Sequence, residues 1–76
     1  MNNQRRKTLK EIYEIIANAK DNLEEVLSEE EEYRDNIPDN LQGSEKYEKA
    51  EEACYNIEEG ISSLEEALGK IDEACA

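Results

Sequence analysis

The sequence predicts an all-α fold, an antiparallel two-helix hairpin of the coiled-coil type. Two long tracts carry apolar residues at alternating spacings of three and four, the pattern of a coiled-coil seam. The only proline, Pro38, lies between these tracts, and their apolar series match in one antiparallel register. We expect a single domain over residues 1–76, with a helix at about 4–36, a loop at about 37–43 and a helix at about 44–75.

The first helix is predicted from an apolar series that begins at Leu9. The series reads Leu9, Ile12, Ile16, Ala19, Leu23, Val26, Glu30 and Tyr33. Only Glu30 interrupts it, and a long side chain can carry its charge from a seam to water. Pro38 disfavours helical conformation at Ile37, so this helix should end near Asn36.

The segment 36–47 is predicted to be the turn between the helices. It contains the proline, a glycine that interrupts the helical pattern, and Ser44, which can cap the second helix. A calcium loop is disfavoured, because the oxygen ligand, the glycine and the bidentate glutamate are absent from its third, sixth and twelfth positions. A protein-recognition tip remains open. Such a tip would present Asp39, Asn40 and Gln42.

The second helix is predicted from heptads that start at Tyr47. The first and fourth positions are Tyr47, Ala50, Cys54, Ile57, Ile61, Leu64, Leu68 and Ile71. The fifth and sixth positions are always acidic: Glu51, Glu52, Glu58, Glu59, Glu65, Glu66, Asp72 and Glu73. Folding the chain back sets Leu9 across from Ile71, so one register satisfies both series.

A second, nearly uncharged surface lies beside the seam of the second helix. Its expected members are Ala53, Gly60, Ala67 and Ala74, faced by Ile15 and Asn22 of the first helix. A two-helix seam buries its apolar side chains incompletely, so an isolated hairpin of this size has a thin margin of stability. We therefore expect a homodimer, a four-helix bundle formed through this surface. Binding of a host protein there is the alternative.

Composition narrows the functional classes. The net charge is −12 and histidine is absent, so the usual general base and the carboxylate–histidine metal motif are missing. We expect no enzymatic activity, no cofactor and no metal ion. An acidic chain repels nucleic acid and anionic membranes and favours a basic partner. No apolar run approaches the ~20 residues of a membrane span, and no signal peptide is apparent. Cys54 and Cys75 are expected to be free thiols in a reducing compartment.

One stretch of the sequence carries a resemblance. The residues concerned are Asp35, Asn36, Pro38, Leu41, Gln42, Ser44 and Glu48, followed by ISSLEEAL. They resemble small uncharacterised acidic proteins encoded by phages, prophages and mobile elements of Firmicutes. The resemblance covers most of the chain, although only DNIPDNLQGSEKYE is specific to it. It implies the cytoplasm of a bacterial host cell as the location and assigns no role to any residue.

Two functional hypotheses follow from the sequence. In the first, a non-enzymatic phage or mobile-element protein binds and blocks a host protein, for example as an anti-defence inhibitor. Its acidic rows, which repeat every ~10.5 Å along a helix, would occupy a basic nucleic-acid site or would only keep the protein soluble. The candidate contacts are Tyr55, Glu51, Glu58, Glu59, Glu65, Glu66, Asp39, Asn40 and Gln42. In the second hypothesis, the bundle is a structural or assembly adaptor.

Overall fold

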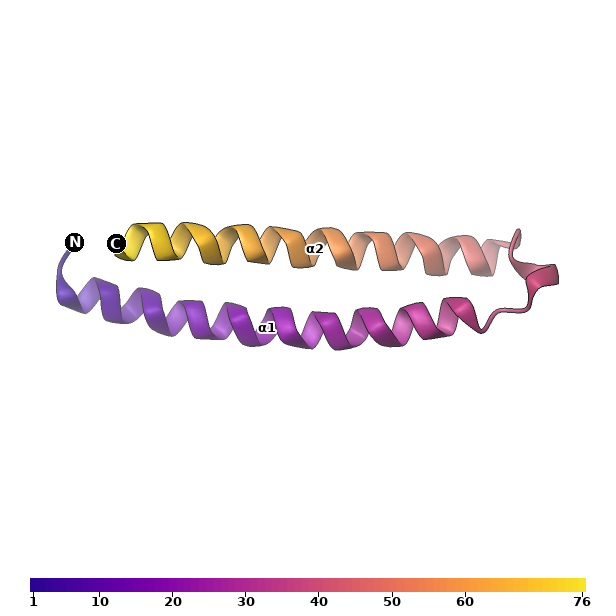
Figure 1. Ribbon diagram of the computed structural model, residues 1–76, viewed down its shortest axis with the longest axis horizontal. Helices are drawn as coiled ribbons and strands as arrows, with labels where there is room; N and C mark the ends of the chain where they lie inside the picture. Colours follow the sequence, from indigo (N-terminus) through magenta and orange to yellow (C-terminus); the bar gives the residue numbers. More distant parts are fainter.

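The computed structural model describes residues 1–76 and confirms the antiparallel two-helix hairpin. The elements are α1 (Asn3–Asp35), the short 3-10 helix η1 (Asp39–Leu41) and α2 (Glu45–Cys75). The molecule is a rod with extents of 59 × 15 × 13 Å, and both termini lie at the end opposite the loop (Figure 1). Compared with the expected bounds, α1 begins and ends one residue earlier, and α2 begins one residue later.

Both helices begin at a side-chain cap. The Asn2 side-chain oxygen accepts a hydrogen bond from the backbone N–H of Arg5 at 2.8 Å. The Ser44 hydroxyl oxygen accepts one from the backbone N–H of Tyr47 at 3.3 Å and donates to the carbonyl of Leu41. These bonds satisfy backbone groups that have no partner within the helix. Ser44 therefore fixes the start of α2 against the loop.

The loop closes one end of the hairpin. Ile37 is 6% exposed and is the only buried residue outside α2. The ammonium of Lys46 lies 5.6 Å from the centroid of the Tyr33 ring, within the range of a cation–π contact. Leu41, in contrast, stays half exposed. The apolar side chain that covers this end of the seam is thus that of Ile37.

The seam of α2 agrees with the sequence prediction. Ala50, Cys54, Ile61 and Leu68 are buried. The other members of the series are half-buried: Tyr47, Ile57, Leu64 and Ile71, followed by Cys75. These side chains face α1 over the whole length of the rod, and Ala53, Gly60 and Ala67 beside them are half-buried as well.

The seam of α1 differs from the prediction in every second position. The exposed members of the predicted series are Ile12, Ala19, Val26 and Tyr33. The residues one position later are half-buried in their place: Tyr13, Lys20, Leu27 and Arg34. Leu9, Ile16, Leu23 and Glu30 are shared by both series. The prediction for α1 is therefore wrong by a rotation of the helix about its axis.

The physical reason is that the apolar surface of α1 is wider than one partner helix can cover. The rotation brings Tyr13 and Leu27, two large side chains, toward α2. It also lets the stem of Lys20 cover the seam while its ammonium reaches Glu65 of α2 at 3.6 Å. A pattern of apolar residues alone does not predict this ion pair. A second apolar line of α1, formed by Ile12, Ala19, Val26 and Tyr33, consequently stays partly uncovered by α2.

Candidate functional site

The net charge of the chain is concentrated in one half of the rod. The Lys20–Glu65 ion pair places these two residues at the same level of the hairpin. Residues 21–64, here called the loop-proximal half, carry fifteen acidic and three basic side chains, a net −12. Residues 1–20 and 65–76, the terminal half, carry six of each, a net zero. The loop-proximal half therefore accounts for the entire net charge.

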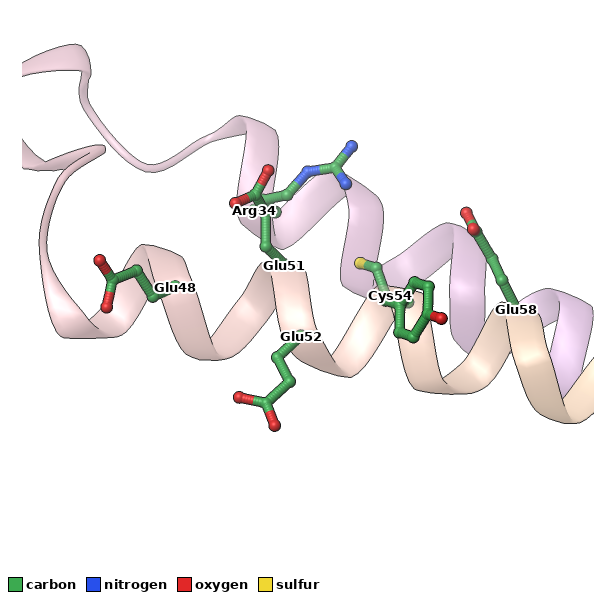
Figure 2. A pocket seen from close by; sticks show the side chains of 7 residues that line it. Arg34, Glu48, Glu51, Glu52, Cys54 and Glu58 are labelled. Carbon is green, nitrogen blue, oxygen red and sulfur yellow. The ribbon is translucent and has the colours of Figure 1, made fainter.

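An open groove lies in the loop-proximal half, where α1 and α2 meet (Figure 2). We call it the acidic groove, and it is lined by Arg34, Glu48, Glu51, Glu52, Cys54, Tyr55 and Glu58. None of its four glutamates forms an ion pair within the chain. Four carboxylates thus have no ion pair beside a single guanidinium, and those of Glu48 and Glu52 point away from it (Figure 2).

The one ion pair of Arg34 is with Asp35, not with these carboxylates. Its Nε donates a hydrogen bond to Asp35 at 3.1 Å. This bond raises the pKa of the Arg34 guanidinium, despite the opposing effect of partial burial. No groove glutamate lies within ion-pair distance of Arg34, and four carboxylates against one guanidinium leave the groove with an excess of negative charge.

Tyr55 adds an aromatic surface to the groove. Its side chain is 60% exposed. In the chain it directly follows the buried Cys54 and lies between two acidic positions, Glu51 and Glu52 on one side and Glu58 on the other. An exposed aromatic ring and free carboxylates are the groups that hold lysine and arginine side chains. The arrangement is therefore suited to a cationic side chain.

Cys54 lies beneath the groove. It is 2% exposed, and burial raises the pKa of its thiol. Arg34 lowers this pKa and Glu30, Glu31 and Glu58 raise it further. Because the thiolate is the reactive form, this environment makes the thiol unreactive.

We expect the two thiols to be modified at different rates. With a thiol reagent at pH 8, Cys75, which is half-buried near the end of α2, should react at least about tenfold faster than Cys54, because attack at Cys54 requires the seam to open. Mass spectrometry of each labelled peptide measures the two rates. In denaturant the rates should become similar. Equal rates in the folded protein would contradict the burial of Cys54.

Only part of the predicted contact set comes together. Tyr55, Glu51 and Glu58 share the acidic groove. Glu59 and Glu66 are exposed outside it, and Glu65 is paired with Lys20. The loop residues Asp39, Asn40 and Gln42 are exposed, and the Gln42 amide donates to the Asp39 carboxylate at 3.0 Å. They are not among the residues that line the groove.

Glu48 and Glu52 were not among the contacts predicted from the sequence. A signal for Glu48 and Glu52 was present, because residues three or four apart share one face of a helix, as Glu48, Glu52 and Tyr55 do. The position of Arg34 follows from the antiparallel register, which sets Lys20 and Arg34 of the first helix on the flank that also presents Glu51 and Glu58 of the second.

A second surface, here called the bare face, lies on the opposite flank of the hairpin. Lys20 contacts both Glu24 and Glu65, which defines the charged flank. The side of α1 away from Glu24 and the side of α2 away from Glu65 form the other flank. It comprises Ile12, Ile15, Ala19, Asn22, Val26 and Tyr33 of α1 with Ala53, Gly60, Ala67 and Ala74 of α2.

The bare face is open as well as apolar. Ile15 is 68% exposed, the largest fraction among the bulky apolar side chains. A Cβ atom added at Gly60 would meet nothing within 4 Å. Of the residues predicted to form a dimer interface, Ile15, Asn22 and Ala74 are exposed and Ala53, Gly60 and Ala67 are half-buried. The rotation of α1 adds Ile12, Val26 and Tyr33 to this flank.

Neither helix has a stretch that is both long and apolar enough to cross a membrane. No group of three or more cysteine, aspartate or glutamate side chains is arranged to hold a metal ion. Comparison of the sequence with protein-family models and with curated proteins, and of the fold with solved structures, finds no match.

Proposed function

We propose that this chain is a non-enzymatic binding protein whose acidic groove occupies a basic site on another protein. The observation that carries the proposal is the set of four glutamates that remain without an ion pair around the exposed Tyr55. A lysine or arginine side chain entering the groove would meet carboxylates and an aromatic ring. Because α2 is a continuous helix, these groups keep a fixed spacing.

The partner we propose is a host protein with a nucleic-acid-binding surface. The acidic positions of α2 extend beyond the groove at seven-residue intervals, about 10.5 Å apart. Carboxylates in fixed rows compete with phosphates for the same lysine and arginine side chains. The resemblance to acidic proteins of phages and mobile elements favours a role as an inhibitor of a host factor, such as a defence protein.

The test is a binding measurement with charge-matched variants. The groove variant carries Glu51→Gln, Glu52→Gln and Glu58→Gln. The control carries Glu66→Gln, Asp72→Asn and Glu73→Gln, which removes three charges from the terminal half. Host proteins captured at 0.1 M salt are purified and titrated with each variant. We expect the groove variant to bind at least about tenfold more weakly, a loss of about 1.4 kcal/mol. The control, which removes charges of the same rows outside the groove, should lose much less.

The dependence of binding on salt concentration, and competition by nucleic acid, give the second readout. Binding should weaken strongly as the Debye length falls from about 10 Å at 0.1 M to about 3 Å at 1 M salt, and the chain should compete with DNA or RNA for the partner. Equal losses in both variants would mean that overall charge, and not the groove, attracts the partner. A partner that is lost on Tyr55→Ala but retained by the groove variant would refute imitation of nucleic acid.

The bare face favours a second candidate function, a structural or assembly adaptor. A dimer paired through this face would carry two acidic grooves and could join two partner molecules. The stoichiometry of the purified complex separates the two functions. An adaptor holds two partners in one particle and leaves their nucleic-acid sites free, whereas an inhibitor excludes nucleic acid from its partner.

A further inference from the structure

The hairpin leaves much of its apolar surface uncovered. Only five of the 76 residues are buried, and Cys54 alone has a side chain that is almost completely so. Meanwhile Ile12, Ile15 and Val26 are each 40% exposed or more. These three lie on the bare face, where α2 leaves much of their surface uncovered. A contiguous exposed apolar surface on a small protein is typical of an interaction site.

The size of the bare face is sufficient for one further copy of the hairpin. Its residues span about 32 Å of each helix at about 1.5 Å per residue, on a rod that is 15 Å wide. Two such faces would bury on the order of 1,000 Å² in projection, the lower bound for a specific interface. A second hairpin has the same length and shape, so it covers the face from end to end.

We propose that the bare face is the docking surface for a second copy of this chain, and that the two hairpins pack with their loops at opposite ends. In this dimer, α1 lies along α1 of the partner and α2 along α2 of the partner. The acidic grooves lie on the outer flanks. The result is a four-helix bundle with a two-fold axis perpendicular to the helices.

Charge determines the relative direction of the two hairpins. If the loops lay at the same end, two loop-proximal halves with a net charge of −12 each would be adjacent. With the loops at opposite ends, each loop-proximal half lies beside a terminal half whose net charge is zero. Like charges across an interface are strongly unfavourable, so the second arrangement is preferred.

The N-terminal segment strengthens this preference. Residues 1–10 contain Arg5, Arg6, Lys7 and Lys10 and no acidic side chain. With opposite ends and an axis near Asn22, residues 5–10 lie across from residues 34–39 of the partner. This part of the partner carries Asp35 and Asp39 against one basic side chain, Arg34, and follows the four glutamates at 29–32. Attraction at both ends of the bundle therefore adds to the preference for this direction of packing.

The bare face also predicts where the two-fold axis crosses α1. Its large residues run from Ile12 to Tyr33, and the midpoint of this line is close to Asn22. The axis thus places Asn22 opposite the partner's Asn22, where each side-chain amide can both donate and accept a hydrogen bond. A polar residue at such a position fixes the register of paired helices. On the other side, Gly60 and its neighbouring alanines allow the two α2 helices to approach closely.

A single cysteine at the axis tests this arrangement. The variant carries Asn22→Cys together with Cys54→Ala and Cys75→Ser, so that no other thiol is present. Mild oxidation should convert most of it to a covalent dimer on a non-reducing gel, because only residues near the axis come within the ~7 Å between Cα atoms that a disulfide allows. The control carries Asn18→Cys in the same background. Asn18 is exposed on the outer side of α1, so this control should remain mostly uncrosslinked.

Other outcomes overturn the proposal. If the loops lay at the same end, Asn22 would be adjacent to Ser63 of α2 in the other copy. The variant with both Asn22→Cys and Ser63→Cys would then give covalent dimers, whereas Asn22→Cys alone would not. If the Asn22→Cys and Asn18→Cys variants kept the native helicity but had a monomeric mass before oxidation, the docking of a second copy would be contradicted altogether.

Discussion

Replacing Leu68 by alanine is expected to lower the free energy of unfolding by about 2–4 kcal/mol, the cost of deleting a buried leucine side chain. Leu68 is 8% exposed and lies in the seam of α2. For a domain of this size each 1 kcal/mol corresponds to about 4–8 °C in Tm, so a decrease of at least about 10 °C should follow. Thermal unfolding monitored by circular dichroism measures it.

The control for this substitution is Leu41→Ala. It deletes the same atoms from a leucine that is 46% exposed in the loop. The expected cost is less than about 1.5 kcal/mol, because much of this side chain already contacts water. If both variants lost the same stability, the α2 seam would not be the core of the fold.

The second large effect is expected for Gly60→Arg combined with Ala67→Arg. Both positions lie on the bare face, and arginine there would place two unpaired guanidinium groups in an apolar interface. The dissociation constant of the dimer should rise at least about 100-fold, a loss of about 2.7 kcal/mol. Sedimentation equilibrium over a range of concentrations measures this constant.

A matched control distinguishes the bare face from general effects of charge. Gly69→Arg combined with Ser62→Arg adds the same two charges to exposed positions of α2 outside the bare face. As at Gly60, a Cβ atom at Gly69 meets nothing within 4 Å, so both variants should keep the helicity of the native chain. The control should remain a dimer. Dissociation of both variants would mean that the interface lies elsewhere.

The sequence predicted the hairpin because its signals are local and agree with one another. Pro38 and Ser44 mark the end of one helix and the start of the next, and the heptads of α2 leave a single line of side chains to face a partner. These patterns depend only on helical geometry and on capping, which neighbouring residues determine. The architecture and the seam of α2 could therefore be predicted from the chain alone.

The rotation of α1 could not be predicted in the same way. Two adjacent apolar lines of α1, one with Ile12 and the other with Tyr13, are both compatible with a coiled-coil seam. The choice between them depends on contacts with α2, such as the ion pair of Lys20 with Glu65. Of the acidic groove, the sequence identified Tyr55, Glu51 and Glu58 but not Glu48 and Glu52.

The central claim is that one flank of the hairpin is reserved for a second copy, while the acidic groove on the other flank is free for a partner. The mass of the native protein in solution tests this claim most directly. Sedimentation equilibrium at micromolar concentration and 0.15 M salt should give twice the 8.7 kDa of one chain. A mass of 8.7 kDa that stays constant as the concentration rises would contradict the claim, because the bare face would then have no second copy to cover it.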